Sequence, residues 1–230
     1  MRLKSGSVMT NLIILDFDGT IINTVPLVTE ILNCLRSRRG LPLLTLSDVR
    51  PWISQGGIPM ISNCLSVSDV EARKYLDEFR GIYFNTPTPL NLVYNWVFDF
   101  LNFAAESAYE LAVCSNKPEE LLNKALRDTN LAKFFSLTVG GTGTTRAKPH
   151  PDRLLAILKT LECKHDNAIM IGDSSIDQQT CRSASVNFIL FQGGYDDGVR
   201  LKSPDCAFLH FTELKDILNG KQDFACSSII

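Results

Sequence analysis

The chain has 230 residues, of which 45% are hydrophobic, enough apolar material to bury the core of one domain with a modest insertion. Its 23 basic and 25 acidic residues give a net charge of −2, which provides no basic surface of the kind that nucleic-acid binding requires. No apolar run approaches the roughly 20 residues that span a membrane. The sequence therefore predicts neither a nucleic-acid partner nor a membrane.

The seven cysteines form no Cys-x-x-Cys pair and have no paired spacing. In a chain of this length, such cysteines indicate free thiols in a reducing compartment rather than a disulfide framework. The first apolar run, Leu12–Leu15, is stopped by Asp16 and Asp18 and cannot serve as the core of a signal peptide. We therefore expect a cytoplasmic protein.

Residues 11–15 contain the continuous apolar run Leu12–Leu15, with two β-branched side chains, which predicts a strand buried on both faces of a parallel sheet. Three further runs of the same kind follow, at residues 111–114, 168–171 and 186–191. Helical patterns lie between these runs, at residues 118–127, 151–161 and 177–185. This alternation predicts an α/β fold with a Rossmann-like parallel sheet.

A long interval, from residue 23 to residue 92, interrupts the alternation and shows helical periodicity without a clear buried strand. A crossover between parallel strands needs only about a dozen residues, so this interval predicts an inserted helical domain. We assign residues 1–22 and 93–220 to the core domain, 23–92 to the insertion and 221–230 to a C-terminal tail.

Asp16 and Asp18 stand one residue apart directly after the first predicted strand, and Gly19 and Thr20 follow. Ligands of an open parallel sheet bind beyond the carboxyl ends of its strands, and Gly19 permits the turn that lets both carboxylates reach such a site. One acid would attack as a nucleophile while the other handles the proton of the leaving group. We place Gly19 and Thr20 among the residues that bind the substrate phosphate. The alternative is an Asx-rich turn that only ends the strand.

Ser115 and Asn116 follow the second predicted strand. Their hydroxyl and amide groups, with nearby backbone N–H groups, could hold phosphoryl oxygens. They could equally form the N-cap of the helix that begins near Pro118.

Lys148 precedes the helical pattern that begins near Pro151. A fixed cation beside the nucleophile would neutralise charge on both the carboxylate and the transferring group. A solvated surface lysine is the alternative, and His150 is read as a turn residue.

Asp173 and Asp177 follow the strand predicted at residues 168–171. Together with Asp16 and Asp18 they would form an oxygen-rich site suited to Mg²⁺, and the lack of a Cys or His cluster disfavours zinc. Asp177 could instead serve as a helix N-cap, or do both.

These motifs resemble those of the haloacid dehalogenase superfamily, and the resemblance extends over about residues 12–218. It implies a Rossmann-like core with an inserted helical cap domain, Asp16 as nucleophile and Asp18 as general acid and base. It matches Ser115 and Lys148 to the second and third motifs of the superfamily. It also implies a Mg²⁺ ion held by Asp16, the backbone carbonyl of Asp18 and the acidic fourth motif.

The resemblance also narrows the reaction. Dehalogenases of the superfamily lack an acid at the position of Asp18, so a phosphatase acting on a small phosphorylated metabolite is implied. Residues 49–57 and 148–151 are similar to segments of phosphoglycolate phosphatases, although N-acetylmuramate 6-phosphate phosphatases share the first segment. On this basis Arg50, Gln55 and Gly56 are predicted to bind substrate; the alternative is a glycine-marked helix break with Trp52 in the core.

Other functions stay open at this point. A phosphomutase similar to β-phosphoglucomutase and a nucleotidase or pyrophosphatase share the same core motifs. A binding module without activity is a further alternative, which the intact acidic motifs disfavour. We expect a monomer or a homodimer.

Overall fold

The computed structural model describes residues 12–53, 55–195, 197–199, 201 and 205–218. The predicted tail at residues 221–230 and the first residue of the first predicted strand, Asn11, lie outside the described residues.

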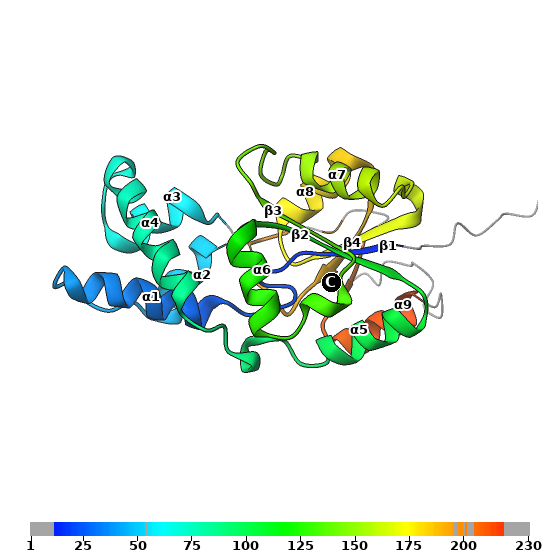
Figure 1. Cartoon of the computed structure of the whole chain (residues 1–230), viewed down its shortest axis with the longest axis horizontal. Coiled ribbons are helices and arrows are strands. Elements are labelled where there is room, and N and C mark those ends of the chain that lie inside the picture. The colour runs from blue at the N-terminus through cyan, green and yellow to red at the C-terminus, as the bar shows by residue number, and fades with distance from the viewer. Residues whose placement is uncertain (1–11, 54, 196, 200, 202–204, 219–230) are drawn as a thin grey trace, which may run out of the picture.

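A six-stranded parallel sheet forms the centre of the core domain (Figure 1). Its strands are β1 (Leu12–Leu15), β2 (Glu110–Pro118), β3 (Leu137–Gly141), β4 (Ala168–Gly172), β5 (Asn187–Phe191) and β6 (Cys206–Phe208). They lie in the order β3-β2-β1-β4-β5-β6, so β1 has β2 on one side and β4 on the other. The strand order reverses direction at β1, and such a switch point is where ligands bind in open α/β sheets.

Helices cover both faces of the sheet (Figure 1). One face packs against α5 (Val97–Glu106), α6 (Glu119–Asp128) and α9 (Phe211–Leu218). The other face packs against α7 (Asp152–Thr160) and α8 (Ser175–Ala184). Because β1 lies between these layers, its alternate residues serve both: Ile13 and Leu15 join the first apolar cluster, and Leu12 and Ile14 the second. The predicted doubly covered parallel sheet is confirmed.

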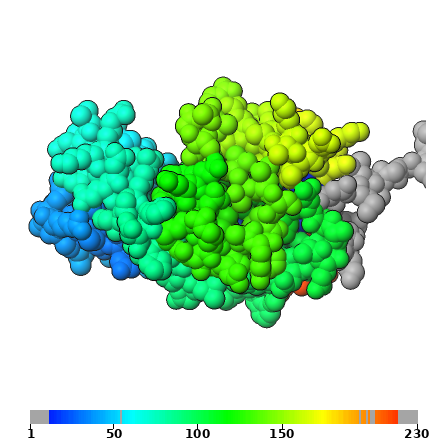
Figure 2. Space-filling model, viewed as in Figure 1, coloured from blue at the N-terminus to red at the C-terminus, as the bar shows by residue number. Residues whose placement is uncertain are grey.

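The inserted segment consists of α1 (Val25–Arg38), α2 (Leu46–Ile53), α3 (Gly57–Leu65) and α4 (Asp69–Asn85). These helices share an apolar core of their own, which Leu121 and Tyr195 of the core domain also join. Figure 2 shows this helical cap at one end of the core, with an indentation where the two meet. The linkers run side by side, because Ile22 and Val93 form an antiparallel bridge at the expected limits of the insertion.

The structure adds elements that the sequence did not predict, namely β3, β6, α5 and α9. It also starts α8 at Ser175, two residues before the predicted helix. The helical structure is interrupted after α2 by Gly56 and by Gly57, the first residue of α3, whose φ angles of 55° and 48° glycine adopts without steric cost. Trp52 is half-buried against the cap core beside this break. In the described part of the chain, no helix combines the length and the apolar character that crossing a membrane requires.

Candidate active site

The acidic and polar motifs converge because their strands are neighbours in register. Leu15 of β1 pairs with Val113 of β2 and Ile171 of β4, so the residues just after these paired positions lie together at the carboxyl ends of the strands. Asp16, Ser115 and Asp173 all lie there and are buried. The structure thus brings together residues that are far apart in the sequence.

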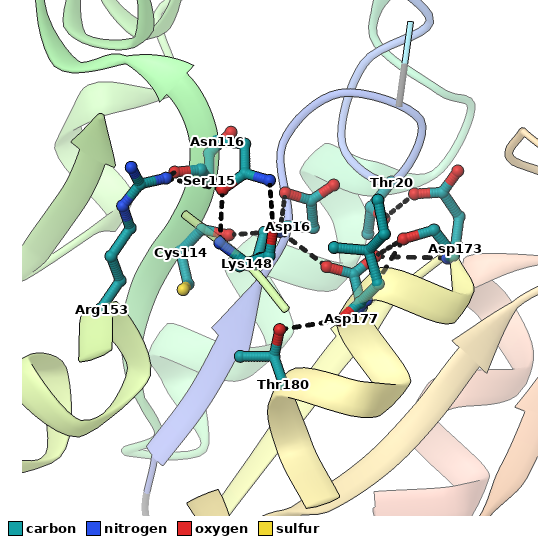
Figure 3. A network of polar contacts seen from close by, with 12 residues as sticks. Asp16, Thr20, Cys114, Ser115, Asn116, Lys148, Arg153, Asp173, Asp177 and Thr180 are labelled. Atoms are coloured by element: carbon teal, nitrogen blue, oxygen red, sulfur yellow. Dashed lines mark hydrogen bonds and ion pairs between the residues drawn. The ribbon is translucent and has the colours of Figure 1, made fainter. Parts of the chain in front are cut away.

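Lys148 is the electrostatic centre of the site (Figure 3). Its ammonium donates to Asp16 Oδ1 and to Asp177 Oδ1, both at 2.6 Å, and to the Cys114 carbonyl at 2.9 Å. The side chain of Lys148 is only 3% exposed. Burial disfavours its charge, but the carboxylates of Asp16 and Asp177 outweigh burial and raise the pKa of Lys148. Lys148 is therefore a permanent cation rather than a surface lysine.

Asp16 is a buried carboxylate in a crowded acidic environment. Burial raises the pKa of Asp16 from 3.8 to about 7. The charge of Lys148 lowers this pKa in part, and the charge of Asp177 raises it further. The ammonium of Lys148 is shared with Asp177, so it cannot by itself hold Asp16 ionised at low pH. A further cation beside Asp16 would favour the ionised form that a nucleophile needs.

Asp173 is held from two sides. Its Oδ1 accepts a hydrogen bond from the Thr20 hydroxyl at 3.0 Å, and its Oδ2 accepts one from the Tyr195 backbone N–H at 2.7 Å. Gly19 has a φ of +95°, and a Cβ there would lie 2.3 Å from Asp173 Oδ2. Gly19 and Thr20 therefore contact Asp173 and are not among the residues that line the cavity, so this conformation does not support their predicted contact with the substrate phosphate.

Asp177 occupies the third residue of α8 and not its N-cap, which corrects the simple capping alternative. Ser174 is the N-cap, and its backbone N–H and hydroxyl donate to Asp177 Oδ2 at 3.2 and 2.5 Å. The other oxygen of Asp177 accepts from Lys148. A capping box of α8 thus fixes the carboxylate that orients Lys148.

Three carboxylates meet closely enough to share one cation. Asp16, Asp173 and Asp177 each offer an oxygen, and these oxygens lie within 4.8 Å of one another. Burial, followed by the charges of Asp177 and Asp16, raises the pKa of Asp173 well above its ordinary value. One ammonium among three carboxylates leaves negative charge in excess, and the oxygen-only donor set suits a hard divalent cation such as Mg²⁺. The residues present therefore fit a magnesium site.

The Asp18 side chain stands apart from this cluster, although it was predicted with the metal ligands. Its Oδ1 accepts from the Lys117 ammonium at 3.2 Å. Lys117 also lies over the ring of Tyr83, 4.2 Å from the centroid, and its side chain is only 8% exposed. Lys117 was not predicted as a site residue, even though it follows Ser115 and Asn116 directly near the end of a strand.

Ser115 and Asn116 do not cap α6, whose N-cap is Pro118 with no side-chain hydrogen bond. The Asn116 amide instead donates to the Lys148 carbonyl at 3.0 Å and accepts from the Lys148 N–H at 2.8 Å. Arg153, also missed in the sequence, is buried and donates to the Ser115 carbonyl and to Asn116 Oδ1 (Figure 3). These bonds fix the loop that carries Lys148.

A cavity of about 270 Å³ opens above these groups and extends into the cap. Asp16, Asp18, Ser115 and Lys148 line its core end, and Gln55 and Gly56 belong to its cap lining. Arg50 does not line it. The guanidinium of Arg50 donates instead to the Gly194 carbonyl at 2.5 Å and lies over the Tyr195 ring, so its predicted substrate contact is not supported by this conformation.

Curated relatives align with most of this chain. A phosphoglycolate phosphatase of Rhodobacter capsulatus is 28% identical over 219 residues, which cover 92% of this chain and 98% of that protein. A phosphoglycolate phosphatase of Pseudomonas syringae pv. syringae is 26% identical over 222 residues, covering 94% of this chain and 81% of that protein.

Solved structures share the fold. A predicted phosphoglycolate phosphatase of Haemophilus somnus superposes with a TM-score of 0.78 at 24% identity, covering 92% of this chain and 98% of that one. A predicted phosphatase of Clostridium acetobutylicum gives a TM-score of 0.77 at 20% identity, covering 92% and 99%. The family model described as haloacid dehalogenase-like hydrolase matches residues 13–191. With most of its length inside that match, the chain belongs to the haloacid dehalogenase-like hydrolase family.

Proposed function

We propose that this protein is a Mg²⁺-dependent phosphatase that hydrolyses a small phosphorylated metabolite through an aspartyl-phosphate on Asp16. The observation that carries the proposal is that two neighbouring acids, Asp16 and Asp18, bind different lysines. The Lys148 ammonium lies 2.6 Å from Asp16 Oδ1, whereas the Asp18 carboxylate accepts a hydrogen bond from the Lys117 ammonium. Both carboxylates line one cavity. A nucleophile and a separate acid-base group are what hydrolysis in two steps requires.

In the first step, Asp16 attacks phosphorus in line with the leaving oxygen, and Asp18 donates a proton to that oxygen. In the second step, Asp18 accepts a proton from a water molecule that attacks the phosphorus of the aspartyl-phosphate, and Asp16 is released. Lys148 and the Ser115 hydroxyl face the phosphoryl oxygens, where negative charge spreads in the transition state.

A Mg²⁺ ion held by Asp16, Asp173 and the backbone carbonyl of Asp18 would neutralise charge on the nucleophile and on the phosphoryl group. Lys117 positions Asp18 on the leaving-group side of the cavity, because it holds that carboxylate away from the cluster around Lys148. The cap excludes bulk water from the reaction. The free thiols of the described cysteines agree with the proposed cytoplasmic location.

The reaction is tested by a phosphate-release assay over a panel of phosphomonoesters, with Mg²⁺ and with EDTA. The panel contains 2-phosphoglycolate, because curated relatives carry that name, together with N-acetylmuramate 6-phosphate, hexose phosphates and nucleotides. We expect Mg²⁺-dependent release of phosphate from at least one small ester. Formation of an isomeric sugar phosphate without phosphate release would identify a mutase instead, and release from nucleotides alone would identify a nucleotidase.

Magnesium is expected to stabilise the protein more strongly as the pH rises. The folded-state pKa of Asp16, about 7, lies above its ordinary value of 3.8, so the metal-free folded protein binds the proton more tightly than the unfolded chain does. The protonated Asp16 carboxyl group therefore contributes to the stability of the fold below about pH 4, and this contribution is lost as the pH rises towards about 7. Mg²⁺ binds the ionised carboxylates and offsets this loss.

The measurement is the change in melting temperature on adding MgCl₂, against NaCl of equal ionic strength with EDTA. We expect a larger increase at about pH 8 than at about pH 5. An Asp173→Asn variant should show a much smaller increase at both values. An increase that does not depend on pH would contradict the assignment of these carboxylates as the cation site.

A further inference from the structure

The cavity changes its chemistry between its two ends. At the core end the lining includes Asp16, Lys148 and Ser115, the residues that face the phosphoryl group in the proposed reaction. The cap end is lined mainly by apolar side chains, namely those of Val28, Ile53, Met60, Leu76 and Phe79. A leaving group that extends from phosphorus into the cap would contact these apolar side chains. A leaving group gains affinity there in proportion to the apolar surface that it buries.

One helix of the cap spans the length of this wall. Leu76, Phe79, Arg80 and Tyr83 of α4 all line the cavity, and their spacing of three and four residues places them on one face of the helix. Tyr83 marks the catalytic end, because its ring lies beneath the Lys117 ammonium that binds Asp18. At a rise of about 1.5 Å per residue, the backbone of Arg80 lies about 4.5 Å further along the helix axis.

Arg80 places a partly exposed positive charge in the lining of the cavity. Its side chain is 44% exposed, and its ion pair with Asp77 is a loose one of 3.9 Å. Arg80 also lines the neighbouring surface pocket between α4 and the loop after β3, so it stands between that pocket and the cavity. Lys117 and Lys148, by contrast, are buried and bound to carboxylates. Arg80 is therefore a cation with capacity to bind an incoming anion.

We propose that the preferred substrate is the phosphate ester of a hydroxy acid longer than glycolate, with an apolar carbon chain next to the ester oxygen and a carboxylate that Arg80 binds. The proposal rests on the proposed phosphatase function and names its substrate class. Glycolate has one methylene group between its oxygen and its carboxylate, so it would leave most of the apolar wall without contact. A chain of several methylene groups covers the wall and brings the carboxylate to Arg80.

The test compares ω-phosphooxy carboxylates of increasing length, from 2-phosphoglycolate through 4-phosphooxybutanoate to 6-phosphooxyhexanoate, in a phosphate-release assay. We expect kcat/KM to rise by about threefold per added methylene group, as expected for partial burial of each group. Butyl and hexyl phosphate, which have the same chain length but no carboxylate, are the matched comparisons for the two longer acids. At equal length the acid should be preferred by about fivefold, the effect of one partly exposed ion pair.

Two variants isolate the role of Arg80. Arg80→Gln should remove the preference for the acids over the alkyl phosphates and leave the dependence on chain length in place. Arg73→Gln changes an exposed arginine of the same helix that does not line the cavity, and it should behave as wild type. Because Arg80 is exposed, its replacement is expected to leave the fold unchanged, which a melting curve checks.

The outcomes separate this proposal from the function on which it rests. Phosphate release that is fastest for 2-phosphoglycolate, or independent of chain length, would overturn the proposed substrate class while leaving the phosphatase in place. The same holds if Arg80→Gln keeps the full preference for acids. Absence of phosphate release from every ester of the series and of the wider panel would overturn the phosphatase, and this inference with it.

Discussion

Replacement of Asp16 by asparagine is expected to abolish turnover and leave the protein folded. The amide cannot attack phosphorus, and loss of a nucleophile commonly lowers kcat by about 10⁴-fold or more. The fold should keep or gain stability, because the buried carboxylate has a pKa raised to about 7 and the amide carries no charge to desolvate. Lys148 keeps its contacts with Asp177 and the Cys114 carbonyl in the variant.

This result is checked by steady-state kinetics on the best ester of the panel and by urea unfolding. Asp166→Asn, which changes an exposed carboxylate outside the cavity, is the matched control and should retain wild-type turnover. Residual activity of Asp16→Asn above about 1% of wild type would be incompatible with a covalent intermediate on this residue.

Replacement of Lys148 by methionine is expected to lower both turnover and stability, unlike the change at Asp16. The ammonium is the shared partner of Asp16 and Asp177, so its loss leaves two buried carboxylates facing each other without a cation. Removing one partner of a buried ion pair typically costs about 3–5 kcal/mol. Turnover should fall by about 10³-fold, because the charge opposite the phosphoryl group is lost.

The two effects can be measured separately. Urea unfolding with and without Mg²⁺ reports the loss of stability, which Mg²⁺ should partly restore because it brings positive charge back to the cluster. Kinetics under conditions where the variant is folded report the loss of turnover. Lys164→Met, at an exposed position, is the control. A Lys148→Met protein with wild-type stability would show that the ion pairs of Lys148 do not support the fold.

Much of the site could be predicted because the fold is a parallel sheet. Asp16 and Asp173 each follow a continuous apolar run, and the carboxyl ends of neighbouring parallel strands meet at one edge. The position of a residue at a strand end therefore determines that it faces the site. The charge of Lys148 and the motif around it predict a cation beside the nucleophile, and in the structure its ammonium lies 2.6 Å from Asp16 Oδ1.

Edge strands were harder to predict than central strands. β1 and β4 are buried on both faces and consist of uninterrupted apolar residues. β3 and β6 lie at the two edges of the sheet, where most of their residues are only partly buried and polar or small residues are tolerated. Such short strands have no continuous apolar run by which a single sequence could mark them.

The sequence by itself determined the class of fold, the helical insertion and the order of the acidic motifs, because burial and backbone preference leave local patterns in the chain. Tertiary structure decided the partners of each charged group. Asp18 meets Lys117 across 99 positions of sequence, and the backbone N–H of Tyr195 reaches Asp173 from a loop that carries no recognisable motif. Likewise, Arg50 donates to the Gly194 carbonyl and does not line the cavity, whereas Arg80, which was not predicted, does line it. These choices depend on how the cap packs on the core, and packing between distant segments leaves no periodic signal in the sequence.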